Sequence, residues 1–161
     1  MIAKFFFGLS MAIGFFIGLS AIDYGTYTVT RVIDGDTIVV SSWRGEQKVR
    51  LLGVDTPETK DPSQPAQCYG KEATDYTTQL LLNQTVELRR DWSQSNKYKY
   101  NRLLRYVLLN DENVSYNIIV KGFGKEYTYD QPYMTQAVFK EAEHNAKRYK
   151  IGLWKFCNIN N

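Results

Sequence analysis

Acidic and basic side chains occur close together in one stretch of this chain. Two carboxylates, Asp55 and Glu58, follow Arg50 within a few residues. An upstream hairpin that contains Asp34 and Asp36 is expected to bring a third and a fourth carboxylate alongside them. Carboxylates beside an arginine suit a divalent cation that binds a phosphate held by the guanidinium group. These residue types therefore favour chemistry on a phosphodiester.

Hydrolysis of a phosphodiester requires positive charge on the non-bridging oxygens, a positioned water, and a group that orients or deprotonates that water. Arg50 and Arg102 are candidates to bind the phosphate, because the planar guanidinium fork binds it better than an ammonium group. Asp36 and Asp55 suit a hard cation, for which oxygen ligands are preferred. Glu58 is then the carboxylate that remains for the water.

The elements that position these residues are predicted to be short strands. The Asp34-Gly35 pair predicts a tight hairpin turn between two strands within Thr26–Val40. Val49 and Leu51 alternate in the pattern of a partly buried strand that carries Arg50. This strand must end before Pro57, which cannot donate a ladder hydrogen bond.

The rest of the chain alternates helical and strand patterns. Five short strands are predicted in all, with one helix between the third and the fourth, which favours a mainly β fold: a five-stranded Greek-key barrel of the OB type with three helices. In the last helix we expect four residues to face the core: Phe139, Ala142, Ala146 and Tyr149. The strands and helices downstream of Arg50 are predicted at Tyr69–Leu82 (helix), Thr85–Arg90 (strand), Tyr100–Leu109 (strand), Val114–Lys121 (helix) and Thr135–Tyr149 (helix).

Length and composition indicate one folded domain preceded by an apolar segment. The chain has 161 residues, 43% hydrophobic and 23% charged, and its net charge of +3 permits a polyanionic partner without indicating one. Residues 1–22 contain one charge, Lys4, and a small-x-small pattern at Gly18–Ser20. They predict a signal peptide or an N-terminal membrane anchor. We expect an exported protein with its functional domain at 24–157 and a short tail at 158–161.

The cysteines and the histidine have simple interpretations. Cys68 and Cys157 are the only cysteines, and in an oxidising compartment a disulfide between them is expected over two free thiols. Their Cα atoms should then lie within roughly 7 Å. His144 lies in a charged stretch and is expected on the surface. It has no zinc-type spacing to the cysteines, and Ser-His-Asp catalysis has no support.

Four motifs of this chain resemble the staphylococcal nuclease (thermonuclease) family in their order and spacing. They are Val32–Thr37, Arg50–Glu58, Tyr69–Ala73 and Gly152–Trp154, and the resemblance extends over about Thr26–Trp154. It implies an OB barrel with three helices and calcium-dependent hydrolysis of DNA and RNA.

The resemblance also implies roles for individual residues. The calcium ligands would be the carboxylates of Asp36 and Asp55 and the backbone carbonyl of Thr56. The catalytic residues would be Arg50, Glu58 and Arg102, since Tyr100-Asn-Arg102 is similar to the family's Tyr-Gly-Arg. The substrate-binding residues would be Tyr100, Tyr127 and Tyr129.

The chain departs from the family pattern at two positions near Arg102. Tyr98 stands where an aspartate is usual, and Asn101 replaces a glycine, although Asn also tolerates a left-handed conformation. Both departures bear on substrate affinity.

One alternative function belongs to a different class. It is a non-catalytic OB module that binds single-stranded nucleic acid or a protein partner. The retained acids and arginines favour the enzyme, because binding alone does not require a metal pocket beside two arginines. We expect a monomer with nucleic acid as substrate, and membrane contact only if the N-terminal segment is retained.

Overall fold

The computed structural model describes residues 25–59 and 65–158. The predicted signal peptide or anchor at residues 1–22 lies outside the described residues, as do 60–64 and 159–161. None of the helices in the described part of the chain is long and apolar enough to span a bilayer.

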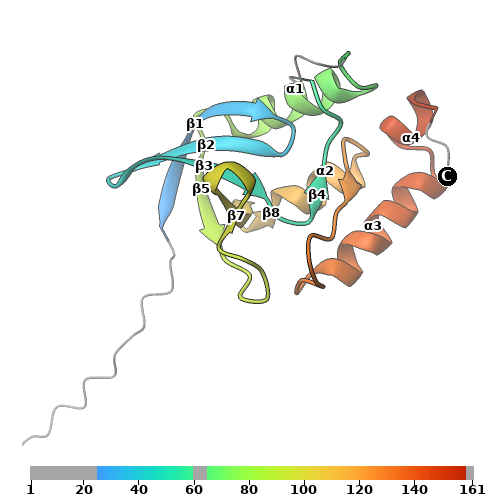
Figure 1. The fold of residues 1–161 in the computed structure, drawn as a ribbon. Coiled ribbons are helices and arrows are strands. Elements are labelled where there is room, and N and C mark those ends of the chain that lie inside the picture. Colours follow the sequence, from blue (N-terminus) through green and yellow to red (C-terminus); the bar gives the residue numbers. More distant parts are fainter. Residues whose placement is uncertain (1–24, 60–64, 159–161) are drawn as a thin grey trace, which may run out of the picture.

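Five strands form a closed barrel (Figure 1). The strands β1 (Thr26–Asp34), β2 (Thr37–Ser42) and β3 (Gly45–Leu51) form an antiparallel meander. The strand β5 (Thr85–Arg89) pairs antiparallel with β1 and with β7 (Arg102–Leu109). A parallel pairing of β3 with β7 closes the barrel. The predicted five-stranded OB barrel is therefore confirmed.

The interior of the barrel is filled by aliphatic side chains from all five strands. Because successive residues of a strand point to opposite faces, each strand contributes alternate residues, as in β5, where Val86 and Leu88 are buried between exposed or half-buried neighbours. The barrel core includes Val29, Ile38, Val40, Val49, Leu51, Val86, Leu88 and Val107.

The three predicted helices are present, and a short fourth one comes after them. They are α1 (Gly70–Leu81), α2 (Val114–Val120), α3 (Gln136–Arg148) and α4 (Leu153–Phe156). In Figure 1, α1 lies over one end of the barrel, while α3 and α4 lie together on another side.

The core face of α3 differs from the prediction at one residue. Phe139, Ala142 and Ala146 are buried as expected, but Tyr149 is 66% exposed. The helix ends at Arg148, and Lys150 adopts a positive φ of 52°, so the chain turns away before Tyr149 reaches the core. The prediction that Tyr149 faces inward was therefore wrong.

Short strand pairings that the sequence did not predict join the connecting segments. The strand β4 (Val54–Asp55) pairs with β9 (Lys125–Glu126). The strands β6 (Lys97–Tyr98) and β8 (Glu112–Asn113) both pair with β7. The predicted strand Tyr100–Leu109 begins two residues late, at Arg102, because Tyr100 and Asn101 adopt left-handed φ values of 59° and 61°.

A disulfide joins the start of α1 to the end of α4. Cys68 and Cys157 are bonded, with their Cα atoms 5.9 Å apart, so this prediction is confirmed. Gly152, just before α4, has a φ of 56°, and a Cβ atom there would collide with the carbonyl of Gly122. Leu153 is fully buried. The C-terminal segment is thus packed against the end of α2 as well as bonded to the loop before α1.

Candidate active site

Asp36 is a buried carboxylate in the turn between β1 and β2, with 6% exposure. Its Oδ1 accepts a hydrogen bond from the Thr37 hydroxyl at 3.0 Å. Its Oδ2 accepts from the Thr56 amide at 2.9 Å and the Thr56 hydroxyl at 3.2 Å, and lies 2.9 Å from Arg50 Nη2. The peptide that comes after β4 is thereby held against this carboxylate.

Arg50 lies on β3 and is 5% exposed. Its Nη1 donates to the carbonyls of Leu51 at 3.1 Å and Val54 at 2.6 Å. Its Nη2 lies within 3.0 Å of both Asp36 and Asp55. Burial alone would lower the pKa of Arg50, but the neighbouring carboxylates, first of all Asp36, raise the pKa above its ordinary value. The guanidinium is therefore charged and fixed in orientation.

Asp34 is the fourth carboxylate of this cluster; the sequence predicted that the hairpin brings it alongside Asp36 but assigned it no catalytic or ligand role. Its Oδ1 accepts a hydrogen bond from the Asp36 amide at 3.2 Å. Burial and the nearby Asp36 charge raise the pKa of Asp34 to about 6. The signal in the sequence was the Asp-Gly-Asp pattern, in which a tight turn brings two acids together.

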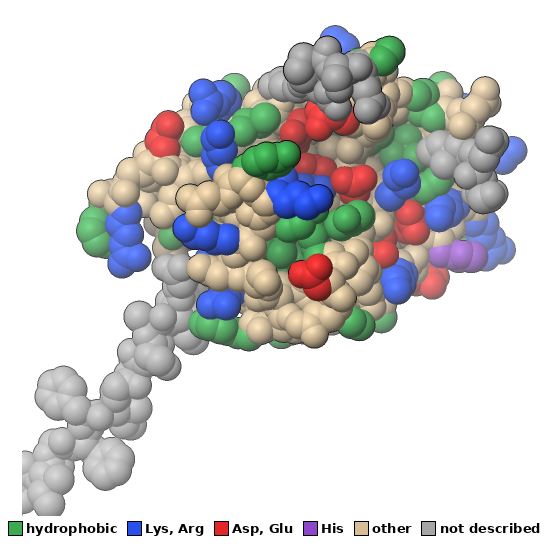
Figure 2. Space-filling view, in the orientation of Figure 1, with side chains coloured by type: hydrophobic (Ala, Val, Ile, Leu, Met, Phe, Trp, Pro, Cys, Tyr) green, Lys and Arg blue, Asp and Glu red, His purple; other side chains and the backbone are tan. Residues whose placement is uncertain are grey.

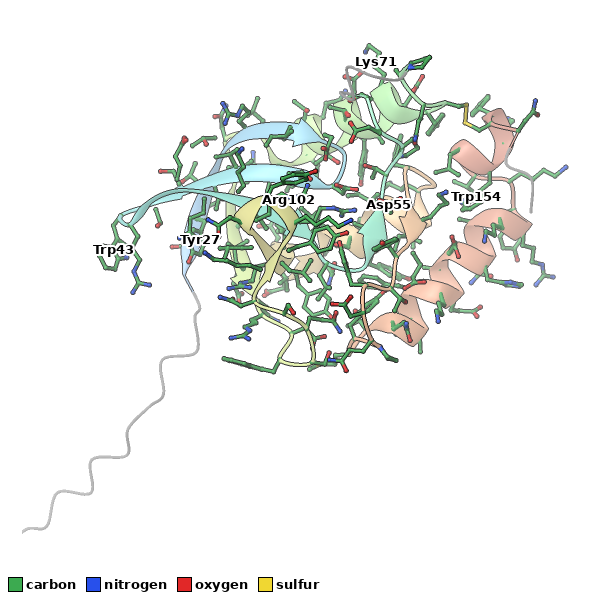
Figure 3. All side chains as sticks on the ribbon, in the orientation of Figure 1. Tyr27, Trp43, Asp55, Lys71, Arg102 and Trp154 are labelled. Atoms are coloured by element: carbon green, nitrogen blue, oxygen red, sulfur yellow. A yellow bond between two sulfur atoms is a disulfide. The ribbon has the colours of Figure 1, made fainter. Side chains whose placement is uncertain are left out.

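One open cleft of about 370 Å³ connects these residues. Figure 2 shows acidic and basic side chains next to one another near the middle of this face, in the region where Figure 3 labels Arg102 and Asp55. The cleft is lined by Asp34, Asp36, Arg50, Asp55, Thr56, Pro57, Glu58, Gln67, Tyr98, Lys99, Tyr100 and Arg102. The five side chains predicted from charge and spacing are all among these residues.

Arg102 reaches the cleft from the start of β7 and is half-buried. Its Nη1 donates to the Thr37 hydroxyl at 3.3 Å, and its Nε donates to the Lys99 carbonyl at 3.2 Å. The guanidinium carbon lies 5.4 Å from the ring centre of Tyr98 and 5.7 Å from that of Tyr100. Hydrogen bonds and cation–π contacts together orient this second arginine.

Glu58 lies on the rim of the cleft and is exposed. Its Oε1 accepts a hydrogen bond from the Thr59 amide at 2.8 Å. Its own amide donates to the side chain of Gln67 at 3.0 Å, and its carbonyl accepts from the Gln67 amide at 2.9 Å. Glu58 therefore lies in the same cleft as the buried pair of Asp36 and Arg50. It lies on a loop, where it forms separate hydrogen bonds with Thr59 and Gln67.

Comparison with known proteins agrees with this geometry. A family described as "Staphylococcal nuclease homologue" matches residues 48–156. The chain belongs to the staphylococcal nuclease family. It is 41% identical over 137 residues to the thermonuclease of Staphylococcus hyicus, and the match covers 85% of this chain and 80% of that protein. It is 38% identical over 130 residues to the thermonuclease of Staphylococcus intermedius, covering 81% and 76%.

A more distant relative belongs to another genus. The endonuclease YncB of Bacillus subtilis is 34% identical over 128 residues, which cover 79% of this chain and 60% of that protein. As a member of the staphylococcal nuclease family with relatives named thermonuclease and endonuclease, the chain is a nuclease, a phosphodiester hydrolase.

The predicted substrate-binding tyrosines of this family member do not all lie in the cleft. Tyr100 lines it and is 88% exposed. Tyr129 is half-buried, donates to the Leu51 carbonyl at 3.2 Å, and has its ring centre 5.9 Å from the Arg50 guanidinium carbon. Tyr127 packs edge to face on Tyr129, with ring centres 4.8 Å apart. Tyr127 and Tyr129 thus form a wall beside the cleft.

The two departures from the family pattern have clear structural settings. Tyr98 extends the tyrosine wall, because its ring packs edge to face on Tyr129 at 4.8 Å and lies beside Arg102. Asn101 adopts the left-handed φ expected of it. Because asparagine adopts the backbone conformation that the family's glycine would adopt here, Arg102 still lies in the cleft.

The oxygen donors around Asp36 and Asp55 fit a hard cation. Within residues 25–59 and 65–158, no three side chains of His, Cys, Asp or Glu are grouped to hold a metal ion together. The expected ligands here are two carboxylates and the Thr56 carbonyl, and the Asp55 side chain is 45% exposed toward solvent. Calcium accepts carboxylates, backbone carbonyls and waters, so this donor set suits calcium with part of its shell supplied by water.

Proposed function

We propose that this nuclease hydrolyses DNA and RNA by a calcium-dependent mechanism in the cleft between β1–β3, the turn after β4 and the start of β7. The proposal rests on the convergence of two arginines, two carboxylates suited to a hard cation, and Glu58 around one cavity. The names of the relatives, thermonuclease and endonuclease, support the same reaction class.

Arg50 and Arg102 bind the non-bridging oxygens of the scissile phosphate. Arg50 is held by two carbonyls and two carboxylates through its two Nη atoms, so its positive charge is fixed in place before negative charge develops on the phosphate. Arg102 is more exposed and is held by Thr37 and by two aromatic rings. We assign Arg50 the fixed position and Arg102 the more adjustable one.

Asp36, Asp55 and the Thr56 carbonyl would hold calcium. When bound, the ion supplies positive charge that polarises a phosphate oxygen. The protein side chains contribute the arrangement: Asp36 is fixed by four contacts, while Asp55 is partly exposed at the edge of the same cleft.

Glu58 orients the attacking water and accepts its proton. The water oxygen forms a bond to phosphorus, and its proton passes to a Glu58 carboxylate oxygen. The bond to the leaving oxygen breaks, and this oxygen keeps the electron pair and takes a proton from solvent water. General base catalysis requires such a group within hydrogen-bond reach of the water. Tyr100, Tyr127 and Tyr129 supply ring faces on which bases of the substrate stack.

The decisive experiment is digestion of plasmid DNA and of RNA by the purified protein, with calcium and with a chelator. We expect both substrates to be degraded with calcium and neither with the chelator. Full activity in the chelator would contradict the calcium-dependent mechanism. Binding of single-stranded DNA without any cleavage would favour the non-catalytic OB module instead.

A second experiment tests Glu58 alone. The substitution Glu58→Gln keeps the shape of the side chain but removes its capacity to accept a proton. We expect calcium and substrate affinities close to those of the wild type and a turnover number lower by about two orders of magnitude or more. A near-normal turnover number would show that this carboxylate does not activate water.

Export and oligomeric state belong to the same proposal. The disulfide between Cys68 and Cys157 suits an oxidising compartment, which supports export directed by residues 1–22. We propose a secreted or envelope-held monomer whose partner is its nucleic-acid substrate, with membrane contact only if the N-terminal segment is retained. Intact-mass measurement of the exported protein tests whether this segment is removed.

A further inference from the structure

Gln67 contacts the backbone of Glu58 from two sides. The Glu58 amide donates to Gln67 Oε1 at 3.0 Å, and the Glu58 carbonyl accepts from the Gln67 amide at 2.9 Å. The strand β4 ends at Asp55, so the ladder hydrogen bonds of the sheet do not extend to Glu58. Gln67 is therefore one of the residues that set the position of Glu58, beside the Thr59 amide that bonds its carboxylate.

The segment after Gln67 packs directly on the same stretch of backbone. The Gly70 amide donates to the Gln67 carbonyl at 3.0 Å. A Cβ atom at Gly70 would lie 2.9 Å from the Pro57 carbonyl oxygen, closer than Cβ atoms approach a backbone oxygen, and 3.1 Å from that of Glu58, a tight contact. The start of α1 is thus in close contact with the chain that carries Glu58.

The start of α1 is in turn fastened to the C-terminal helix. Cys68, the neighbour of Gln67, is bonded to Cys157 at the end of α4. The Tyr69 ring stacks on Phe156, with ring centres 5.9 Å apart and planes 10° apart. Figure 3 shows the sulfur–sulfur bond between the start of α1 and α4.

A cavity lies beside this connection. It has a volume of about 470 Å³, and its lining includes Gln67, both cysteines and Phe156. Asp55 and Pro57 line it as well as the cleft, so it borders the other side of the loop. Cys68 and Cys157 both line this cavity, so the disulfide restrains the segment at a place where it borders open space.

We propose that Gln67 is a positioning residue for Glu58, and that the disulfide to α4 keeps Gln67 in place, so that turnover depends on the state of the disulfide. This inference rests on the proposed role of Glu58 as the base. A dithiol can reduce the bond: it gives up two electrons and two protons, becomes a disulfide itself, and leaves two thiols on Cys68 and Cys157. The C-terminal helix would then control the geometry of a residue far from it in sequence.

Two substitutions of Gln67 test the positioning role. Gln67→Met keeps the length of the side chain but removes the acceptor for the Glu58 amide, and we expect the turnover number to fall about tenfold with KM changed less than about twofold. Gln67→Glu restores an acceptor at the same place. It should return the turnover number to near the wild-type value while raising KM, because its charge repels the phosphate.

The disulfide is tested with the double variant Cys68→Ser/Cys157→Ser and with the wild type treated with dithiothreitol. Both should lose turnover to a similar extent at temperatures far below unfolding, and the double variant should not respond to dithiothreitol. The matched control is Tyr106→Phe, which removes buried hydrogen bonds away from the cleft and should lower the melting temperature without changing turnover.

The outcomes separate this inference from the proposed function. An active wild type whose Gln67→Met and double cysteine variants melt at lower temperature but turn over normally would overturn the inference, since the disulfide would then only stabilise the fold. A loss of turnover in Gln67→Met that Gln67→Glu does not reverse would also overturn it. A wild type that hydrolyses no nucleic acid would overturn the proposed function itself, and the inference with it.

Discussion

Two regions of this nuclease each contain a buried carboxylate and a buried guanidinium, but the partners of these groups differ between the regions. In the cleft, Asp36 and Arg50 pair with each other at 2.9 Å. In the region around the loop at residues 91–96, Asp91 is 2% exposed and accepts four hydrogen bonds from neutral donors. Arg105, 4% exposed, donates to the Leu104 carbonyl and to two oxygens of Asn96.

The difference shows that burial and complete hydrogen bonding do not by themselves mark a functional carboxylate. Asp36 and Asp91 each accept four hydrogen bonds or ion-pair contacts, at similar distances. What distinguishes the cleft is the number of charges of both signs that share one cavity, including Asp34 and Arg102. Such clusters are typical of functional sites, whereas the neutral contacts of Asp91 hold a loop in place.

The largest expected effect comes from replacing each of the two buried arginines in a separate variant. Arg50→Lys cannot contact two carbonyls and two carboxylates with one ammonium group, so we expect the rate of DNA hydrolysis to fall by about two to three orders of magnitude. Arg105→Lys is the matched control and should lower stability while leaving the turnover number within about threefold. Initial rates and thermal unfolding of both variants measure this, and equal rate losses would erase the contrast between the regions.

The next effect separates the two carboxylates. Asp36→Asn removes a proposed calcium ligand and should reduce calcium-dependent hydrolysis more than about a hundredfold. Asp91→Asn should leave hydrolysis unchanged but lower the free energy of unfolding by about 1–3 kcal/mol, because an amide cannot accept all four hydrogen bonds. Rates at saturating calcium and urea unfolding curves check both results. Full activity of Asp36→Asn would remove the basis for placing calcium there.

A smaller effect concerns the pH dependence of stability. Burial alone would raise the pKa of Asp91, but hydrogen bonds from the Met134 amide, from Ser93 and from Tyr106 together lower the pKa below its ordinary value. A lowered pKa in the folded state stabilises the protein above the pKa of the unfolded chain, and this contribution is lost as pH falls through the folded-state pKa.

The stability difference between wild type and Asp91→Asn should therefore be largest near neutral pH and shrink in acid. Urea unfolding of both proteins between about pH 3 and 7 measures it. A difference that stays constant over this range would mean that the charge of Asp91 does not contribute.

The smallest expected effect is at Tyr98, on the rim of the cleft. Tyr98→Asp introduces the residue usual in the family and removes the ring contacts with Tyr129 and Arg102. We expect KM for single-stranded DNA to rise about threefold to tenfold, since a stacking surface is lost, with little change in turnover. Tyr98→Phe keeps the ring and should behave as the wild type. A fall in turnover with unchanged KM would show that Tyr98 acts mainly by orienting Arg102.

The secondary structure and the residues of the candidate site could largely be predicted from the sequence. Charge and spacing selected Asp36, Arg50, Asp55, Glu58 and Arg102, and all five line one cleft in the structure. Apolar alternation and turn residues predicted five strands and three helices, because these patterns reflect local geometry that the chain carries with it. The pairing of the two cysteines was expected from their number.

The meeting of distant segments could not be predicted in this way. The parallel pairing of β3 with β7 brings Arg50 and Arg102 to the same cavity, and no local pattern encodes a contact between strands so far apart in sequence. Tyr98 likewise meets Tyr129 only in the folded chain, as Gln67 meets Glu58. Tyr149 was misplaced for a related reason: helical periodicity predicts a face, but the point where the chain leaves the helix depends on how the next segment packs.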